Sequence, residues 1–418
     1  MLNAVAVFAL LASAPFNDLL NWLDRIAQSQ LDARQKQIES IRTREAAAER
    51  NRAVRAKLLE LLGGLPDYTG PLNARTTGRI QASGYTIEKV VFESLSRYFV
   101  TGNLYVPDTP GKHPGILFPL GHWEQGKPAA QEIAGNLALK GFVVFAYDPV
   151  GQGERVQAYD WRFGRSIAGG STEQHTQHGA LALLVGQELA RYRIWDGKRA
   201  LDYLTSRREV DTARIGCTGC SGGGTLTTYL SALDDRIKVA APSCYMNSFR
   251  VLFPGPLGDS EQSWNGFLAA GLDQTDFVEL FAPKPWLITS TKDDFFTPAG
   301  ARIVYEEAKR WYSLYDAADR IQWVIGPGGH GTPLEVREAV YGWFLKWLGP
   351  AQPGATATEL AVELRPAHEF RVGEVGLVSA DFNSRELYEV IRDAAAVAPR
   401  KVDVAAVSYT HLTLPTKA

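Results

Sequence analysis

The chain has few cysteines and little net charge, and it has no long hydrophobic run. Its three cysteines among 418 residues are too few for a disulfide scaffold. A formal net charge of −2 gives no reason to expect nucleic acid or an anionic membrane surface as a partner. Because no run of 18 apolar residues occurs, no transmembrane helix is expected. What remains is an ordinary globular composition, 45% hydrophobic and 22% charged, with room for one large domain and smaller pieces.

The N-terminal part divides into two segments. Residues 1–16 are mostly apolar and include the small residues Ala12-Ser13-Ala14, which is typical of a signal peptide and predicts export to the periplasm or beyond the cell. No Lys or Arg precedes the apolar run, so a buried N-terminal helix in a cytoplasmic protein is the alternative. Residues 17–66 are predicted to be helical as far as Leu62, because Pro and Gly are absent before Gly63-Gly64.

Residues 67–349 alternate short apolar runs with long helical stretches. This alternation favours an α/β fold with a mostly parallel central sheet and helices on both of its faces. In such a sheet the ligand site lies beyond the carboxyl ends of the strands. The predicted strands are 114–120, 142–147, 215–218, 239–242, 286–289 and 321–325, and the clearest helices are 187–207, 299–315 and 334–348.

The C-terminal part reads as three pieces. Residues 350–357 are rich in Pro, Gly and Ala and are predicted to be a linker. Residues 358–406 look like the start of an incomplete module, so we expect few contacts between them and the preceding domain. The sequence of residues 407–418 is unrelated to the segment before it and resembles the translation of a sequencing-library adapter. This tail is therefore expected to be non-native and to contribute nothing to the fold.

The strongest motif is Gly219-Cys220-Ser221-Gly222-Gly223, which fits G-x-S-x-G. It stands between a predicted strand at 214–218 and a predicted helix at 225–233, the setting of a nucleophile elbow. The tight turn exposes a serine hydroxyl and tolerates only small neighbours. The alternative is a glycine-rich phosphate loop, but the lysine of that motif is absent. Ser221 is therefore the predicted nucleophile.

A serine nucleophile needs a base, and the base needs an acid to orient it. His330 follows the predicted strand 321–325 through a glycine-rich turn and is the predicted base. The acid is expected after the strand 286–289, where Asp293 and Asp294 are the two candidates. Asp294 is preferred because it stands four residues before Pro298, which opens the next helix.

The oxyanion formed during acyl transfer needs two N–H donors. One is predicted to be the backbone N–H of Gly222, directly after the nucleophile. The second is expected from the loop at 121–124, from the backbone of His122 or of Trp123. The ring of His122 is a further alternative that the sequence leaves open. Trp123 and Glu124 are predicted to contact substrate at the mouth of the pocket.

Two further groups of residues have the chemistry of a metal site or of a disulfide. His175 and His178 could face one metal ion on a helix, but no neighbouring carboxylate or cysteine pattern supports this, and neither a metal nor a cofactor is expected. Cys220 and Cys244 each end a predicted strand, and consecutive strands are usually neighbours. The two cysteines are therefore predicted to lie close together, either bonded or as buried free thiols.

Several motifs together resemble a bacterial acetyl xylan esterase-like family of α/β-hydrolase serine esterases. The resemblance covers roughly residues 30–349 and implies an α/β-hydrolase fold and a cofactor-free enzyme, either a carbohydrate esterase or a related esterase with another substrate. A more distant similarity links the chain to glucuronoyl esterases. The motifs are Gly121-His122, Asp148–Arg155, Gly219–Gly224, Asp235-Arg236-Ile237 and Asp294-Phe295-Phe296.

Two departures from these families guide the expected substrate. Gly222 stands where glucuronoyl esterases carry the arginine of G-C-S-R-x-G, and Val150 stands where better-studied acetyl xylan esterases carry the arginine of R-G-Q. The first departure argues against glucuronoyl esterase activity, and the second argues against specificity for acetyl groups of xylan or cephalosporin. The expected function is a serine esterase that removes small acyl groups, acetyl foremost, from a small-molecule or oligosaccharide ester. A general carboxylesterase or small-substrate peptidase is the alternative within the fold. A non-catalytic binding protein on a hydrolase scaffold is a third hypothesis.

Overall fold

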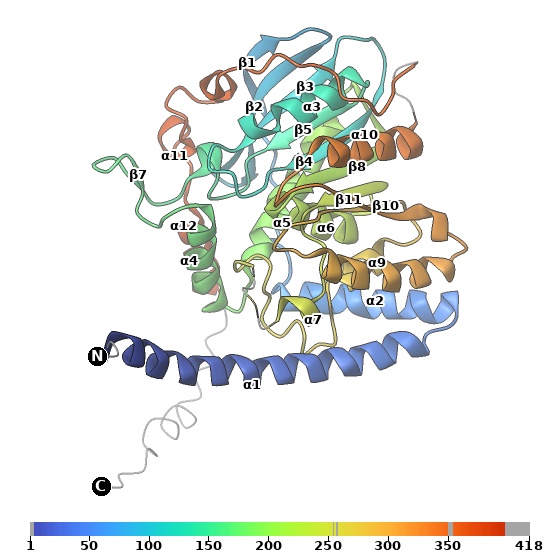
Figure 1. Ribbon diagram of the computed structural model, residues 1–418. Coiled ribbons are helices and arrows are strands. Elements are labelled where there is room, and N and C mark those ends of the chain that lie inside the picture. Colours follow the sequence, from blue (N-terminus) through green and yellow to red (C-terminus); the bar gives the residue numbers. More distant parts are fainter. Residues whose placement is uncertain (1–3, 254, 256–257, 350–353, 398–418) are drawn as a thin grey trace.

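The computed structural model describes residues 4–253, 255, 258–349 and 354–397, and a nine-stranded sheet forms its centre (Figure 1). The strand order is β1-β2-β3-β5-β4-β8-β9-β10-β11. The first three strands and β5 pair antiparallel, and all pairs from β5 to β11 are parallel. The strands are β1 (Arg75–Gln81), β2 (Tyr85–Leu95), β3 (Tyr98–Pro107), β4 (His113–Pro119), β5 (Val143–Tyr147), β8 (Val210–Cys220), β9 (Val239–Ser243), β10 (Trp286–Thr291) and β11 (Ile321–Gly326); a separate hairpin contains β6 (Tyr159–Asp160) and β7 (Arg165–Ser166).

The central strands form where the sequence has continuous apolar runs. Every residue of β4, β5, β9 and β10 is buried, as expected for parallel strands that are covered on both faces. Each of the six predicted strands in residues 114–325 coincides with one strand of the sheet. The predicted α/β-hydrolase fold, with its mostly parallel sheet, is therefore confirmed.

Helices cover both faces of this sheet (Figure 1). One face packs against α5, α6, α8 and α9, with α2 outside them, through a core that includes Leu201, Leu230 and Val304. The other face packs against α3 and α10 through Leu137 and Phe344. The helices are α1 (Ala4–Ser40), α2 (Arg44–Leu61), α3 (Gln131–Leu139), α4 (Ser171–Leu183), α5 (Leu189–Ser206), α6 (Gly222–Leu233), α7 (Phe249–Leu252), α8 (Thr275–Phe281), α9 (Pro298–Ser313), α10 (Leu334–Leu348), α11 (Val378–Asp381) and α12 (Leu387–Val397).

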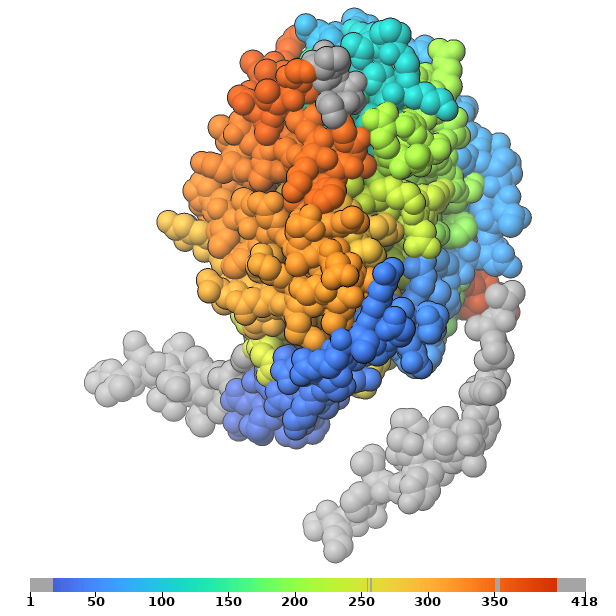
Figure 2. All heavy atoms as spheres, turned by 90° about the vertical axis from the view of Figure 1, so that its right-hand side faces the viewer, coloured from blue at the N-terminus to red at the C-terminus, as the bar shows by residue number. Residues whose placement is uncertain are grey.

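The N-terminal segment consists of two helices, with a break that the sequence pattern did not predict. Helix α1 ends at Ser40 and includes residues 4–16 of the predicted signal peptide, and Thr43 caps α2 by accepting the N–H of Ala46 at 3.2 Å. Arg310 on α9 donates to the carbonyls of Ile38 and Ile41 at this break. Figure 2 shows the blue N-terminal segment lying against the orange segment that contains α9. Among the described helices, none combines the length and the hydropathy that a bilayer span requires.

The expectation of few contacts for residues 358–406 is wrong for the part that the structure describes. The carboxylate of Glu154, itself paired with the buried Lys127, accepts the backbone N–H groups of Val372 and Gly373. Phe370 is buried in the core beneath α3, and Leu387 is buried against α4 and α5. Hydrogen bonds between the backbone of this segment and buried side chains of the domain hold the segment in place. Such bonds leave no apolar periodicity in the sequence. The tail 407–418 lies outside the described residues, as do residues 350–353 of the predicted linker.

Candidate active site

The predicted catalytic residues all lie beyond the carboxyl ends of parallel strands. Ser221 follows β8 directly, Asp294 follows β10, and His330 follows β11. His122 follows β4, the strand beside β8 in the sheet. The fold therefore brings together at one edge four residues that are far apart in the sequence.

Ser221 occupies a strained turn between β8 and α6. Its φ of 58° and ψ of −124° are unfavourable for a residue with a side chain, as in a nucleophile elbow. Its N–H donates to the carbonyl of Ser243 on the neighbouring strand at 2.9 Å, which holds the turn in place. Helix α6 begins at Gly222, three residues before the predicted Thr225. The N–H of Gly222 is thus in the first helical position, where no intrahelical acceptor exists.

His330 and Asp294 form a hydrogen-bonded pair. The Nδ1 atom of His330 lies 2.9 Å from Oδ1 of Asp294. Burial alone would raise the pKa of Asp294, but the bonds from His330 and from the N–H of Phe296 hold it below its ordinary value. Asp293 is exposed and its backbone N–H donates to Gly328. Of the two predicted acids, Asp294 is the one that the fold aims at the histidine.

Two phenylalanines connect this pair to a hollow above the serine. The ring of Phe295 stacks on His330 at a centroid distance of 4.3 Å and an interplanar angle of 28°. Phe295 and Phe296 also line a hollow of about 390 Å³ whose wall includes Ser221 and His122. Asp259, Gln262, Thr172 and Thr176 complete its polar rim. The hollow is therefore small, with a polar rim and aromatic residues next to the histidine.

The ring of His122 lies against the residue after the nucleophile. A Cβ atom on Gly222 would meet Cε1 and Nε2 of His122 at 2.7 Å, so a side chain at 222 and the ring exclude each other. Nε2 of His122 lies 2.7 Å from Glu261 and 3.2 Å from Asp259. Burial would lower the pKa of His122, but these two carboxylates outweigh it and raise the pKa to about 9. His122 is thus an imidazolium at neutral pH.

Asp259 and Glu261, which no sequence motif indicates, also bind a second histidine and an arginine. His175 on α4 lies 2.7 Å from Asp259 through Nδ1 and 2.7 Å from the carbonyl of Val150 through Nε2. Nε of the buried Arg193 lies 2.6 Å from Glu261. Burial and the Arg193 guanidinium lower the pKa of His175, which is therefore neutral. No motif indicated this network, because its members come from four separate segments.

The described residues include two groupings with the spacing of metal ligands at the active site, and one of them is Cys244 with the Asp294–His330 pair. The other belongs to the network around His122. Ligand atoms of His122, His175, Asp259 and Glu261 lie within 4.8 Å of one another. The guanidinium of Arg193 already lies among them as a fixed cation, with Nη1 about 3 Å from His175. His178, the other histidine considered for a metal, instead lies 2.7 Å from the carbonyl of Gln174 through Nδ1. The grouping is accounted for as a network of ion pairs.

The residues predicted for the oxyanion hole and for substrate contact differ in their surroundings. The backbone N–H of Trp123 donates to the carbonyl of Gly121 at 2.7 Å, so it is occupied. The half-buried Trp123 side chain packs against the hydrophobic core, and among the described residues it does not line the hollow above Ser221. Glu124 is exposed and lines a neighbouring hollow. The donors that remain for an oxyanion are the N–H groups of Gly222 and His122 and the His122 ring.

Cys220 and Cys244 lie close together, as predicted, and both are free thiols. The β8–β9 register pairs Cys220 with Ser243, the residue before Cys244. The Cys244 thiol donates to the carbonyl of Gly331 at 3.0 Å. Contact with Cys244 and burial raise the pKa of Cys220 well above its ordinary value. The pair therefore packs beneath the catalytic loop, where burial keeps the Cys220 thiol protonated.

Comparison with known proteins assigns this architecture to a family. The family model described as acetyl xylan esterase matches residues 75–264. The Bacillus subtilis (strain 168) protein YtaP, which carries the name of a hydrolase, is 30% identical over 307 residues, or 70% of this chain and 98% of its own length.

Solved structures agree. Methylesterase BT1017 has a TM-score of 0.70 at 26% identity, covering 89% of this chain and 80% of its own. A glucuronoyl esterase from Solibacter usitatus shares the fold, with a TM-score of 0.56 at 15% identity, covering 74% of this chain and 94% of its own. The chain is therefore a carboxylic ester hydrolase and belongs to the acetyl xylan esterase-like family of α/β hydrolases.

Proposed function

We propose that this protein is a serine esterase in which Ser221, His330 and Asp294 act as a catalytic triad on short acyl esters of carbohydrate, acetyl foremost. The observation that carries the proposal is the 2.9 Å bond between His330 and Asp294, at the same edge of the sheet as a serine held in a strained turn. A base held by its orienting acid and a serine in a nucleophile elbow are what a catalytic triad requires.

The chemistry follows from the same contacts. Asp294 accepts the Nδ1 proton of His330, which leaves Nε2 as the base for the Ser221 hydroxyl. Oγ of Ser221 attacks the ester carbonyl, and the resulting oxyanion accepts the N–H of Gly222 and a donor from His122. The protonated His330 then passes its proton to the departing sugar oxygen, which leaves an acyl-enzyme. Water, activated by His330, releases the acid and restores the serine.

Short acyl groups fit the space above the serine. The hollow of about 390 Å³ has charged and hydroxyl groups on its rim, from His122, Asp259, Thr172 and Thr176. Such a rim can hydrogen-bond sugar hydroxyls, whereas a long aliphatic chain would leave these groups desolvated and unpaired. The similarity to acetyl xylan esterases supports the same acyl group. Export, expected from residues 1–16, suits a polysaccharide substrate and forms part of the proposal.

A second candidate is hydrolysis of methyl esters of uronic acids, and one observation favours it. The His122 imidazolium lies in the space that a side chain at 222 would need, so the cation that glycine 222 lacks is supplied from the β4 loop. The lack of an arginine at position 222 therefore counts less against hydrolysis of such esters. The similarity to Methylesterase BT1017 points the same way.

One experiment separates these candidates. kcat/KM is measured in parallel on an acetylated xylo-oligosaccharide, a methyl glucuronate and a long-chain acyl ester, with Ser221→Ala as the control. We expect the acetylated sugar to give the highest value and Ser221→Ala to lower kcat by roughly 10⁴-fold or more. A higher value for the glucuronate would establish the second candidate, and a higher value for the lipid would establish a general carboxylesterase. Full activity of Ser221→Ala would overturn the triad.

A further inference from the structure

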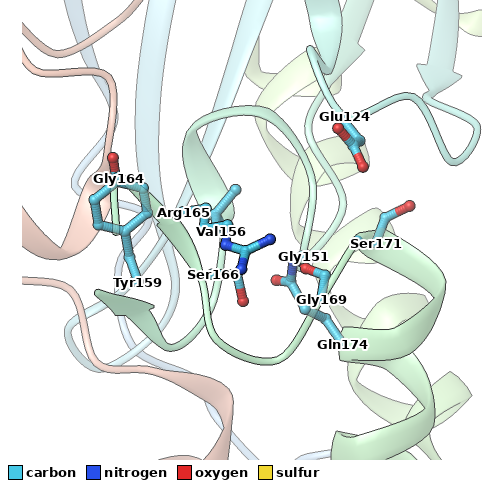
Figure 3. Close-up of a pocket in the computed structure, with 11 residues that line it drawn as sticks. Glu124, Gly151, Val156, Tyr159, Gly164, Arg165, Ser166, Gly169, Ser171 and Gln174 are labelled. Atoms are coloured by element: carbon cyan, nitrogen blue, oxygen red, sulfur yellow. Dashed lines mark hydrogen bonds between the residues drawn. The ribbon is translucent and has the colours of Figure 1, made fainter. Parts of the chain in front are cut away.

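We propose that the hollow between the β6–β7 hairpin and the first turn of α4 is a glycan subsite, which binds the sugar chain flanking the ester-bearing residue. This inference rests on the proposed function and deepens it, because it makes an oligomeric or polymeric glycan the substrate. The hollow has a volume of about 440 Å³. Figure 3 shows the residues around it, with Arg165 and Tyr159 from the hairpin, Glu124 from the loop after β4, and Ser171 and Gln174 from α4.

The hollow adjoins the catalytic one. Ser171 and Gln174 line the proposed subsite, whereas Thr172 and Thr176 of the same helical turn line the hollow above Ser221. The Ser171 hydroxyl also donates to the carbonyl of His122 at 3.4 Å. One turn of α4 therefore forms a shared wall. A ligand that occupies both hollows is long enough to include more than one sugar residue.

The polar groups of the subsite are available to a ligand. Arg165 and Glu124 are exposed, and neither forms an ion pair or a side-chain hydrogen bond with another described residue. A guanidinium offers donors and a carboxylate offers acceptors, which together suit the vicinal hydroxyls of a sugar. Gln174 beneath them is fixed, because it bonds the backbone of Gln157 and Gly169. Gln174 therefore forms a fixed floor of the hollow, and the side chains of Arg165 and Glu124 above it are free to bind a ligand.

The hairpin adds exposed aromatic surface beside these charges. Trp161 is 63% and Phe163 64% exposed, and the exposed Ile167 follows β7. The Tyr159 ring meets Trp161 edge-on at a centroid distance of 4.9 Å, which supports the indole from one side. Exposed apolar clusters on a folded protein mark binding surfaces. Sugars present an apolar C–H face between hydroxyl edges, so an aromatic surface next to a free guanidinium and a free carboxylate matches a glycan.

The position of the patch favours glycan over other occupants. Figure 1 shows the hairpin standing out from the body of the molecule on the side of α4. A lipid surface would have to desolvate both Arg165 and Glu124, which is costly for unpaired charges. A second copy of the chain would cover the patch without using the hollow that adjoins the nucleophile. Substrate is the occupant that uses the aromatic tip, the charges and the shared wall together.

The test compares two polymers with one small ester. Trp161→Ala and Arg165→Ala are assayed on acetylated xylan, on methyl-esterified polygalacturonan and on 4-nitrophenyl acetate. Trp22→Ala removes a tryptophan on α1 that is also exposed, by 51%, but lies outside the proposed subsite, and it serves as the matched control. We expect both hairpin variants to lower kcat/KM on the hydrolysed polymer about 10-fold, mainly through KM, and to leave 4-nitrophenyl acetate hydrolysis unchanged. Trp22→Ala should change neither.

Binding of deacetylated xylan or polygalacturonan to the Ser221→Ala protein, followed by affinity electrophoresis, gives a readout that does not need turnover. If adding Trp161→Ala to the Ser221→Ala protein abolishes its retention by the polymer, the subsite is supported. Equal losses on polymer and small ester, no loss on either, or a change of oligomeric state in Trp161→Ala would each overturn it. A wild-type protein that fails to hydrolyse 4-nitrophenyl acetate would instead overturn the proposed function.

Discussion

The ring of His122 occupies the space that a side chain on Gly222 would need: its Cε1 and Nε2 atoms lie 2.7 Å from where the Cβ atom of residue 222 would be. The glycine after the nucleophile therefore has a second role besides the tight turn. It admits an imidazolium that Glu261 and Asp259 hold beside Ser221. A cation in this place comes from a loop about a hundred residues away, and the elbow motif itself does not reveal it.

Gly222→Ala should lower kcat by at least about 10-fold, because the new Cβ displaces the His122 ring from the oxyanion side. Steady-state kinetics on 4-nitrophenyl acetate measure this. Gly329→Ala is the control, since a Cβ there meets no atom within 4 Å. Unchanged activity in Gly222→Ala would show that the position of the ring is not used.

His122→Gln should lower kcat by about 10²-fold and remove an alkaline limb of the pH profile. Carboxylates raise the pKa of His122 to about 9, so the ring is cationic below that pH and neutral above it. Activity that depends on the cation is thus lost as pH rises through about 9. Stability should follow the same sign, since the raised folded-state pKa gives a contribution fully present below about pH 6.5 and lost as pH rises through 9. A wild-type kcat/KM profile without a limb near pH 9 would exclude the cationic role.

Asp294→Asn should lower kcat on the order of 10⁴-fold by favouring the wrong tautomer of His330. Asp293→Asn is the matched control, because its side chain is exposed and only its backbone is engaged. If Asp293→Asn proved the more damaging of the two, the assignment of the acid would be wrong.

Arg34→Met should destabilise the protein by about 3 kcal/mol in urea unfolding, because it breaks a buried ion pair from one side. Arg34 binds Asp276 and Glu307, each at 2.7 Å, and its side chain is 3% exposed. Arg25 on the same helix is exposed, and Arg25→Met should change the free energy of unfolding by less than about 0.5 kcal/mol. Equal effects would show that α1 is not held by this pair.

Deletion of residues 407–418 should leave the thermal midpoint and activity unchanged. Truncation after residue 357 should lower the midpoint strongly, because it removes the N–H groups that satisfy Glu154 and exposes the sites of Phe370 and Leu387. Thermal unfolding of both truncations is the measurement. A large loss from the shorter deletion would mean that the tail is structural.

Local sequence was enough to predict much of this protein. Runs such as Val143–Tyr147 predicted buried strands because parallel strands need apolar residues on both faces. The small residues around Ser221 indicated the elbow, the glycine-rich turn after a strand indicated His330, and the spacing to Pro298 indicated Asp294, since each depends on a few neighbouring residues.

Only the tertiary structure decided which residues contact His122 and whether residues 358–397 pack against the domain. The contacts of His122 with Glu261 and Asp259, and of Glu154 with Val372, join segments more than a hundred residues apart. Ion pairs and backbone hydrogen bonds of this kind leave no periodicity in a sequence. They arise because folding brings polar groups into a low-dielectric interior, where each must find a partner whatever its place in the chain.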